Sequence, residues 1–121
     1  MRLKNILIVV SNIEKSKAFY RELFGLDVIT DFGGNVILTE GLVLQEKRDW
    51  ESLIGQKTLC GGCDAELYFE ENQMDTFLEK LTHYNFPIRY LNEPTAQEDG
   101  RRVVRIYDPD GHVIEVGEVE K

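Results

Sequence analysis

The chain has 121 residues, of which 42% are hydrophobic and 30% charged, a length and composition typical of one globular domain. Its formal net charge of −8 argues against nucleic acid as a partner, because phosphates need a basic surface. No apolar run reaches the roughly 18 residues of a membrane span, and the N-terminal segment leads into polar, helix-starting residues rather than a cleavage site. We therefore expect a cytoplasmic protein with a single core and no membrane partner.

The first half of the chain predicts a strand, a helix and then three short strands. The apolar run "NILIVV" begins at Asn5 and is typical of a strand. Helical spacing follows in the apolar side chains Ile13, Phe19, Tyr20, Leu23 and Phe24. Ser11 with Glu14 fits a capping box, and Gly25 is a natural residue after the last turn. The segments "LDVITDF", "NVILT" and "LVLQE" are the strand candidates, separated by glycine-containing breaks.

The same order returns about sixty residues later, which indicates an internal repeat. Here "AELYFE" predicts a strand and "NQMDTFLEKLTHYN" a helix, with Asn72 as a plausible cap. The strand candidates that follow are "IRYLN", "RRVVRIY" and "HVIEVGE". The last two are joined by Asp108-Pro109-Asp110-Gly111, in which proline and glycine suit a tight turn.

The repeated order predicts an α+β fold, because each amphipathic helix needs a sheet to cover its apolar stripe. We expect two tandem βαβββ modules that form a cupped mixed sheet with the helices on the convex face. Module one is assigned to about residues 1–50, a linker to about 51–63 and module two to about 64–121. Together they make a single domain, 1–121.

Alternation along the strands assigns side chains to the two faces of the second sheet. If the isoleucine and valine that flank Glu115 lie under the helix, then Glu115 faces the open side. By the same logic Glu66 and Tyr68 face the open side. A rival role for Glu115 follows from the hairpin, because a three-residue turn at 109–111 would place Arg105 opposite Glu115 and allow an ion pair.

Two stretches, "VVSNIEKSKAFYRELFGLDV" near the start and "YDPDGHVIEV" near the end, resemble the vicinal oxygen chelate superfamily. This superfamily includes glyoxalase I, bleomycin-resistance proteins, fosfomycin-resistance enzymes and extradiol dioxygenases. The resemblance covers nearly the whole chain and includes the internal duplication. It implies a homodimer, because members with two such modules commonly build each cleft across the subunit interface. The chemistry is not implied, since one fold hosts many activities.

In metal-dependent members, the resemblance implies four ligands, one from the first and one from the last strand of each module. The matching positions here are Asn5, Gln45, Glu66 and Glu115. The match in module two holds to within one residue, so Asp64 or Ala65 could replace Glu66. Two amides and two carboxylates without histidine are a poor ligand set for Zn²⁺, Ni²⁺, Mn²⁺ or Fe²⁺. We expect no tightly bound cofactor, with a divalent metal as the alternative.

The histidines and cysteines give weaker signals. His112 lies at the predicted turn or on the helix side, and His83 lies within the second helix, so we interpret both as surface or turn residues. Cys60 and Cys63 flank two glycines in "LCGGCD", whereas a zinc ribbon would need a second such pair. We interpret them as an incidental loop pair, with a redox or metal role as the alternative.

Ligand-binding candidates come from the aromatic and basic residues that remain. They are Trp50, Tyr68, Arg105 and Tyr107. Trp50 lies in a segment that is compatible with a short helix, where a core contact is the alternative role. Phe32 and Tyr90 could complete an aromatic pocket. The arginines of "GRRVVRIY" could clamp a carboxylate or phosphonate, or remain solvated charges at an edge.

These observations lead to three hypotheses. The first is a glyoxalase/bleomycin-resistance-like protein that binds a small molecule in a cleft of the cupped sheet, without a tightly bound transition metal. The alternative is a divalent-metal-dependent, lactoylglutathione lyase-like enzyme that uses Glu115 or Glu66 as base or ligand. A dioxygenase is less favoured, because the two histidines that usually hold its iron are missing from the matching positions. A third possibility is an assembly or regulatory domain.

Overall fold

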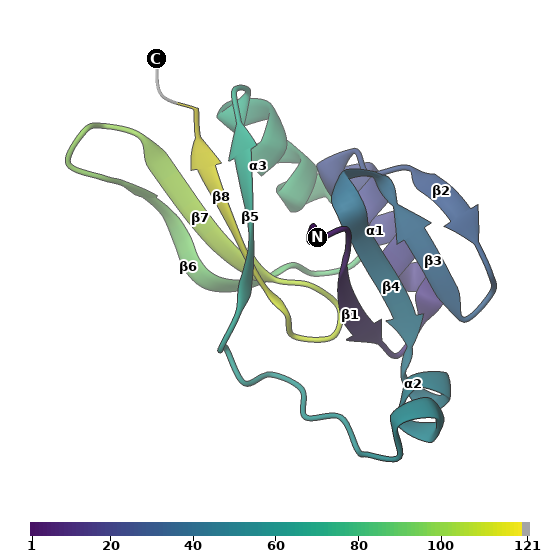
Figure 1. Ribbon diagram of the computed structural model, residues 1–121. Helices are drawn as coiled ribbons and strands as arrows, with labels where there is room; N and C mark the ends of the chain where they lie inside the picture. The colour runs from purple at the N-terminus through teal and green to yellow at the C-terminus, as the bar shows by residue number, and fades with distance from the viewer. Residues whose placement is uncertain (120–121) are drawn as a thin grey trace. The chain divides into compact units, whose positions relative to one another are not determined.

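A computed structural model of the protein describes residues 1–119. The chain divides into two compact units, which we call module one (residues 1–59) and module two (from residue 60 on). Each module contains one four-stranded mixed sheet (Figure 1). The predicted α+β fold with two tandem modules is therefore confirmed. Within the described residues, no helix combines the length and hydropathy needed to cross a membrane.

Module one follows the predicted order of a strand, a helix and three strands, and adds a second helix. Its elements are β1 (Ile6–Val10), α1 (Ile13–Phe24), β2 (Val28–Asp31), β3 (Asn35–Leu38), the 3₁₀ turn η1 (Thr39–Gly41), β4 (Leu42–Glu46) and α2 (Lys47–Ile54). The strands lie in the order β1-β4-β3-β2, with β1 parallel to β4 and the other pairs antiparallel. The short helix predicted around Trp50 is α2.

The N-terminal cap of α1 is one residue later than the capping box predicted. Asn12, rather than Ser11, is the capping residue, and its side-chain oxygen accepts a hydrogen bond from the backbone N–H of Lys15 at 3.1 Å. Both residue types can cap a helix, so the choice between neighbours depends on the backbone. Gly25 ends the helix in the left-handed conformation, at φ 69°, as predicted.

One face of the module one sheet is covered by α1. Lys17 of α1 bonds the carboxylate of Asp31 in β2 at 2.8 Å, and Asp31 pairs in register with Val36. Side chains on this face are almost fully buried, among them Val10, Val36, Leu38 and Leu44, together with Phe19, Tyr20 and Leu23 from α1. The opposite face, which we call the open face of module one, contains Gln45 and its cross-strand neighbour Asn35.

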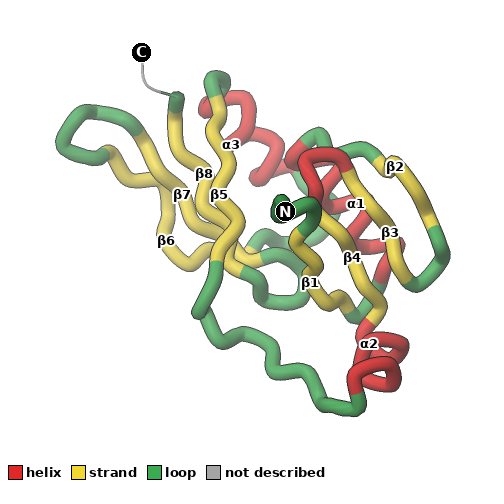
Figure 2. The backbone as a smooth tube through the Cα atoms, in the orientation of Figure 1, coloured by secondary structure: helices red, strands yellow, loops and turns green. Residues whose placement is uncertain are grey.

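Module two repeats this arrangement. Its elements are β5 (Glu66–Glu71), α3 (Met74–His83), β6 (Arg89–Ala96), β7 (Arg102–Tyr107) and β8 (Val113–Glu118). The strand order is β5-β8-β7-β6, with β5 parallel to β8 and the others antiparallel. Figure 2 shows the connection from α2 to β5 as a long loop. The predicted cap Asn72 is again displaced by one residue, because Gln73 holds the cap position without a side-chain bond.

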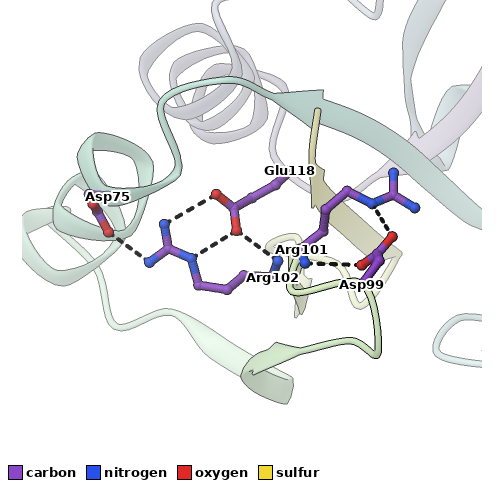
Figure 3. A network of polar contacts seen from close by, with 5 residues as sticks. All are labelled: Asp75, Asp99, Arg101, Arg102 and Glu118. Carbon is purple, nitrogen blue, oxygen red and sulfur yellow. Dashed lines mark hydrogen bonds and ion pairs between the residues drawn. The ribbon is translucent and has the colours of Figure 1, made fainter. Parts of the chain in front are cut away.

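A network around Arg102 holds α3 against the sheet of module two (Figure 3). Arg102 donates from Nε to Glu118 at 2.9 Å and from Nη1 to Asp75 of α3 at 2.7 Å. These carboxylates raise the pKa of the guanidinium, Glu118 first. The neighbouring Arg101 pairs separately with Asp99 at 2.6 Å. Both arginines therefore have carboxylate partners within their own module.

The core of module two lies between α3 and its sheet. Met74, Phe77 and Leu81 of α3 are buried, as are the inward side chains Val104, Ile106, Ile114 and Val116. Ile114 and Val116 therefore lie under the helix as alternation predicted. The opposite side of this sheet, which we call the open face of module two, holds Arg105, Tyr107 and Glu115 from β7 and β8.

Candidate functional site

The hairpin between β7 and β8 is the turn that positions the candidate site. The backbone N–H of Asp108 donates to the carbonyl of His112 at 2.9 Å, and that of Gly111 donates to the carbonyl of Asp108 at 3.1 Å. Residues 109–111 thus form the three-residue turn on which the predicted Arg105–Glu115 ion pair depends. Its consequence is the register that places Arg105 opposite Glu115.

Asp108 organises this turn from a buried position. The residue is only 1% exposed. Oδ1 accepts hydrogen bonds from the backbone N–H groups of Asp110 and His112, each at 2.9 Å, and Oδ2 lies 2.7 Å from His112 Nδ1. His112 is therefore a turn residue, one of the roles predicted for it. His83, the other histidine, is an exposed residue at the end of α3.

His112 gives the turn a pH dependence. Burial lowers its pKa, but the hydrogen bond and charge of Asp108 raise it, and the net pKa lies above the ordinary 6.5. The ion pair therefore stabilises the fold fully below pH about 6.5, and its contribution is lost as the pH rises through the higher folded-state pKa. We expect an NMR titration of the imidazole to give this raised pKa in the wild type and a lower one in Asp108→Asn. An unchanged pKa in that variant would contradict the assignment.

Glu115 is held by the predicted cross-strand ion pair. Arg105 Nε donates to Glu115 Oε1 at 2.7 Å, and Arg105 Nη1 donates to Asn92 Oδ1 of β6 at 3.1 Å. The Glu115 side chain is 16% exposed and that of Arg105 is 37% exposed. The carboxylate thus already has a cationic partner, whereas more than a third of the arginine side chain is accessible.

Tyr68, rather than Glu66, is the neighbour of Glu115 on β5. The parallel register pairs Tyr68 with Glu115, and Glu66 with Val113. The Tyr68 side chain extends diagonally across β8 to Gly117: a Cβ atom on Gly117 would lie only 2.6 Å from the Tyr68 hydroxyl oxygen. Tyr68 is 52% exposed. Both predicted residues therefore face the open side of module two, and Tyr68 is the one brought beside Glu115.

Tyr107 forms a second aromatic element on this face. The Arg89 guanidinium carbon lies 5.0 Å from the centre of the Tyr107 ring, a cation–π arrangement, and the two residues pair across β6 and β7. A contact of 3.9 Å joins the Tyr107 hydroxyl to Cys63 Sγ. This hydrogen bond, followed by burial, raises the pKa of Tyr107. The sequence did not point to Arg89, because only the register between β6 and β7 places it beside Tyr107.

The wider aromatic pocket predicted from the sequence does not form within module two. Tyr90 pairs with Ile106, whose side chain belongs to the buried face under α3, so Tyr90 does not share the face of Tyr107. Burial, and then the charge of Glu93, raise the pKa of Tyr90. Phe32 belongs to module one, where it is 70% exposed. Tyr68 and Tyr107 are the members of that set that share one face.

In module one, the structure does not bring Asn5 and Gln45 together. The parallel register sets Val9 beside Gln45, and Gln45 accepts a hydrogen bond from Asn35 Nδ2 at 2.8 Å. Asn5 precedes β1 and lies near Gly41, at the other end of the sheet. Val9 lies four positions after Asn5, which corresponds to about 13 Å along the strand direction.

Asn5 lines a hollow of ≈ 430 Å³ at the end of the sheet where β1 and β4 begin. The hollow is formed by Arg2, Leu3, Lys4, Asn5, Ile29, Thr30, Ile37, Leu38 and Gly41. Its volume falls in the range of small-molecule sites. Trp50 is half-buried in α2 and does not line it. Module one therefore offers a hollow near one predicted residue, away from Gln45 and Trp50.

The donor groups fit a tightly bound transition metal poorly. Among residues 1–119, no three side chains of histidine, cysteine, aspartate or glutamate lie close enough to hold a metal ion. Gln45 bonds Asn35, and Glu115 is paired with Arg105. Each would have to give up a protein partner before it could bind a metal. Whether any metal binds stays a prediction.

The chain matches the glyoxalase-like domain family over residues 3–120. No curated protein matches the sequence. Among solved structures, a protein of unknown function from Agrobacterium tumefaciens strain C58 is 33% identical, with a TM-score of 0.83 over 99% of this chain and 95% of that one. The protein therefore belongs to the glyoxalase-like domain family, within the vicinal oxygen chelate superfamily that its sequence resembles.

Two more distant structures share the fold. A lactoylglutathione lyase from Agrobacterium tumefaciens is 20% identical, with a TM-score of 0.71 over 97% of this chain and 92% of that one. A glyoxalase/bleomycin resistance protein/dioxygenase family enzyme from Burkholderia phytofirmans PsJN is 16% identical, with a TM-score of 0.79 over 97% and 98% of the two chains. At these identities the likeness concerns the fold alone.

Proposed function

We propose that the protein binds a small organic molecule on the open face of module two, without a tightly bound transition metal. The Arg105–Glu115 ion pair carries this proposal, because it occupies the carboxylate that a metal would need and leaves part of a guanidinium accessible. Tyr68 lies beside the pair on β5, and Tyr107 lies two residues from Arg105 on β7. Glu66 flanks the same face and is exposed.

The chemistry of this face favours a guest with a flat apolar part and a polar end. The exposed Tyr68 ring and the half-buried Tyr107 ring offer apolar surface for stacking, and a guanidinium presents several N–H donors in one plane. A carboxylate, carbonyl or similar acceptor of the guest would meet Arg105, and a donor would meet Glu115. A few polar groups between aromatic walls are typical of small-molecule sites. This is the binding type expected from the bleomycin-resistance members that the sequence resembles.

A set of small aromatic acids and amines tests the binding site directly. We expect members of the set to shift the NMR signal of Arg105 Nε–H and the ring signals of Tyr68 and Tyr107. Arg105→Lys should weaken binding at least several-fold, because lysine keeps the charge but loses the planar fork. Arg101→Lys is the matched control, since Arg101 pairs with Asp99 in the loop between β6 and β7, before β7 begins. If no compound shifts these signals, or if both variants bind equally, the proposed site is wrong.

Metal analysis separates this proposal from the lyase alternative. We expect purified protein to contain clearly less than one equivalent of zinc, nickel, manganese or iron, because the donor groups are two amides and two carboxylates, one of which is paired with Arg105. A full equivalent that EDTA removes would contradict the proposal. Hemithioacetal turnover that needs Ni²⁺ or Zn²⁺ and is lost in Glu115→Gln would then support the lyase.

A further inference from the structure

Cys60 and Cys63 stand at the beginning of module two, in the loop that leads to β5. Both are reduced and exposed to solvent. Two glycines, Gly61 and Gly62, separate them, and the segment has no regular secondary structure (Figure 2). Neither thiol is among the proposed ligand-binding residues, although Cys63 contacts Tyr107, which is one of them.

The spacing of the two cysteines suits a disulfide. They are three residues apart, like the two ends of a β-turn, whose Cα atoms lie within about 7 Å. Residues 60–63 form no turn or bend in the structure. Because disulfide-bonded cysteines have Cα atoms about 4.4–6.8 Å apart, the loop must fold into such a turn before the two sulfurs can bond. Gly61 already adopts a positive φ of 77°, and a glycine pair can enter any of the common turn types.

The segment is also seated on the β7–β8 hairpin of the same module. Gly61 Cα lies 3.7 Å from the position that a Cβ atom on Gly111 would take. Cys63 Sγ lies 3.9 Å from the Tyr107 hydroxyl and 3.8 Å from the carbonyl oxygen of Gly61. Oxidation of the Cys63 thiol would therefore change the surroundings of the Tyr107 hydroxyl directly.

We propose that Cys60 and Cys63 form a reversible disulfide that releases Cys63 from Tyr107. With a hydroperoxide as oxidant, one thiolate attacks the terminal peroxide oxygen, which forms a sulfenic acid and releases an alcohol, or water from hydrogen peroxide. The second thiol then attacks that sulfur, so the S–S bond forms and the sulfenic oxygen leaves as water. Two thiols are oxidised and one peroxide is reduced. A small dithiol reverses the reaction by exchange.

Mass spectrometry of the full chain tests disulfide formation. After stoichiometric hydrogen peroxide followed by N-ethylmaleimide, we expect a monomer that has lost two hydrogen atoms and carries no maleimide. Dithiothreitol should restore two alkylation sites. The matched variants Cys60→Ser and Cys63→Ser should show no such loss of two hydrogens within one chain. Two alkylated cysteines after peroxide, a disulfide between chains, or sulfinic acid as the main product would each overturn the proposal.

The ring signals of Tyr107, assigned by comparison with Tyr107→Phe, test the second half of the proposal. We expect these signals to move on oxidation, and the pKa of Tyr107 to fall toward its ordinary value, because its hydrogen bond to Cys63 is the main cause of the rise. In the Cys63→Ala variant, the pKa of Tyr107 should be similar in the presence and absence of peroxide. If the disulfide forms while the Tyr107 signals stay unchanged, the release of Tyr107 is wrong.

Discussion

Replacement of Asp108 by alanine is expected to lower the free energy of unfolding by about 3 kcal/mol, because three hydrogen bonds are lost at roughly 1 kcal/mol each. The carboxylate accepts from two backbone N–H groups and from the His112 ring, and the residue is only 1% exposed. Water cannot easily replace such an acceptor, so the donors are left unsatisfied. Urea unfolding followed by circular dichroism measures the change.

Asp108→Asn is the matched control for this prediction. Its side-chain oxygen can still accept from the two backbone N–H groups, whereas the charged partner of His112 is lost. We expect a loss clearly smaller than that of the alanine variant, and most of the difference from wild type should disappear above the folded-state pKa of His112. A loss below about 1 kcal/mol in Asp108→Ala, less than one typical hydrogen bond, would show that the turn does not depend on this carboxylate.

The Asp108 turn also explains why part of the candidate site could be predicted from the sequence. A proline and a glycine at fixed places in "YDPDGHVIEV" determine the turn locally. Once the turn has three residues, counting along both strands gives the Arg105–Glu115 pair without any other information. Alternation then assigns Ile114 to the core and Glu115 to the other face. These features depend on residues close together in the chain.

The contacts that could not be predicted depend on pairings between distant segments. Nothing in the sequence determines that Val9, rather than Asn5, lies beside Gln45, because the parallel β1–β4 register is fixed by packing across 35 or so residues of chain. The family resemblance supplied four ligand positions but could not supply this register. The same applies to Arg89 and Tyr107, which meet only because β6 pairs with β7 in the observed register.

The helix caps show a smaller limit of the same kind. Ser11 and Asn12 are both good capping residues. Their positions differ by one residue, and only the backbone decides which of them reaches the free N–H groups. The apolar stripes of both helices were nevertheless predicted well, since Phe19, Tyr20, Phe77 and Leu81 are all buried.

The duplication predicts that equivalent core positions of the two modules have similar energetic importance. Leu44 in β4 and Ile114 in β8 are both fully buried. Each lies in the last strand of its module, between a parallel partner and an antiparallel one: Ile8 and Val36 for the first, Leu67 and Ile106 for the second. We expect Leu44→Ala and Ile114→Ala each to lower the free energy of unfolding by about 3 kcal/mol, within the range of roughly 2–5 for such truncations.

Exposed aliphatic residues provide the controls. Ile29→Ala in module one and Leu91→Ala in module two remove side chains of residues that are 63% and 39% exposed, so each should cost well below half of the core value. Urea unfolding of the four variants gives the comparison. The prediction is wrong if one core variant is about as stable as its exposed control while the other is strongly destabilised. The two modules would then not have equivalent cores, and the sequence repeat would reflect a shared fold without a shared distribution of stability. Equal losses would instead mean that the two modules have equivalent cores.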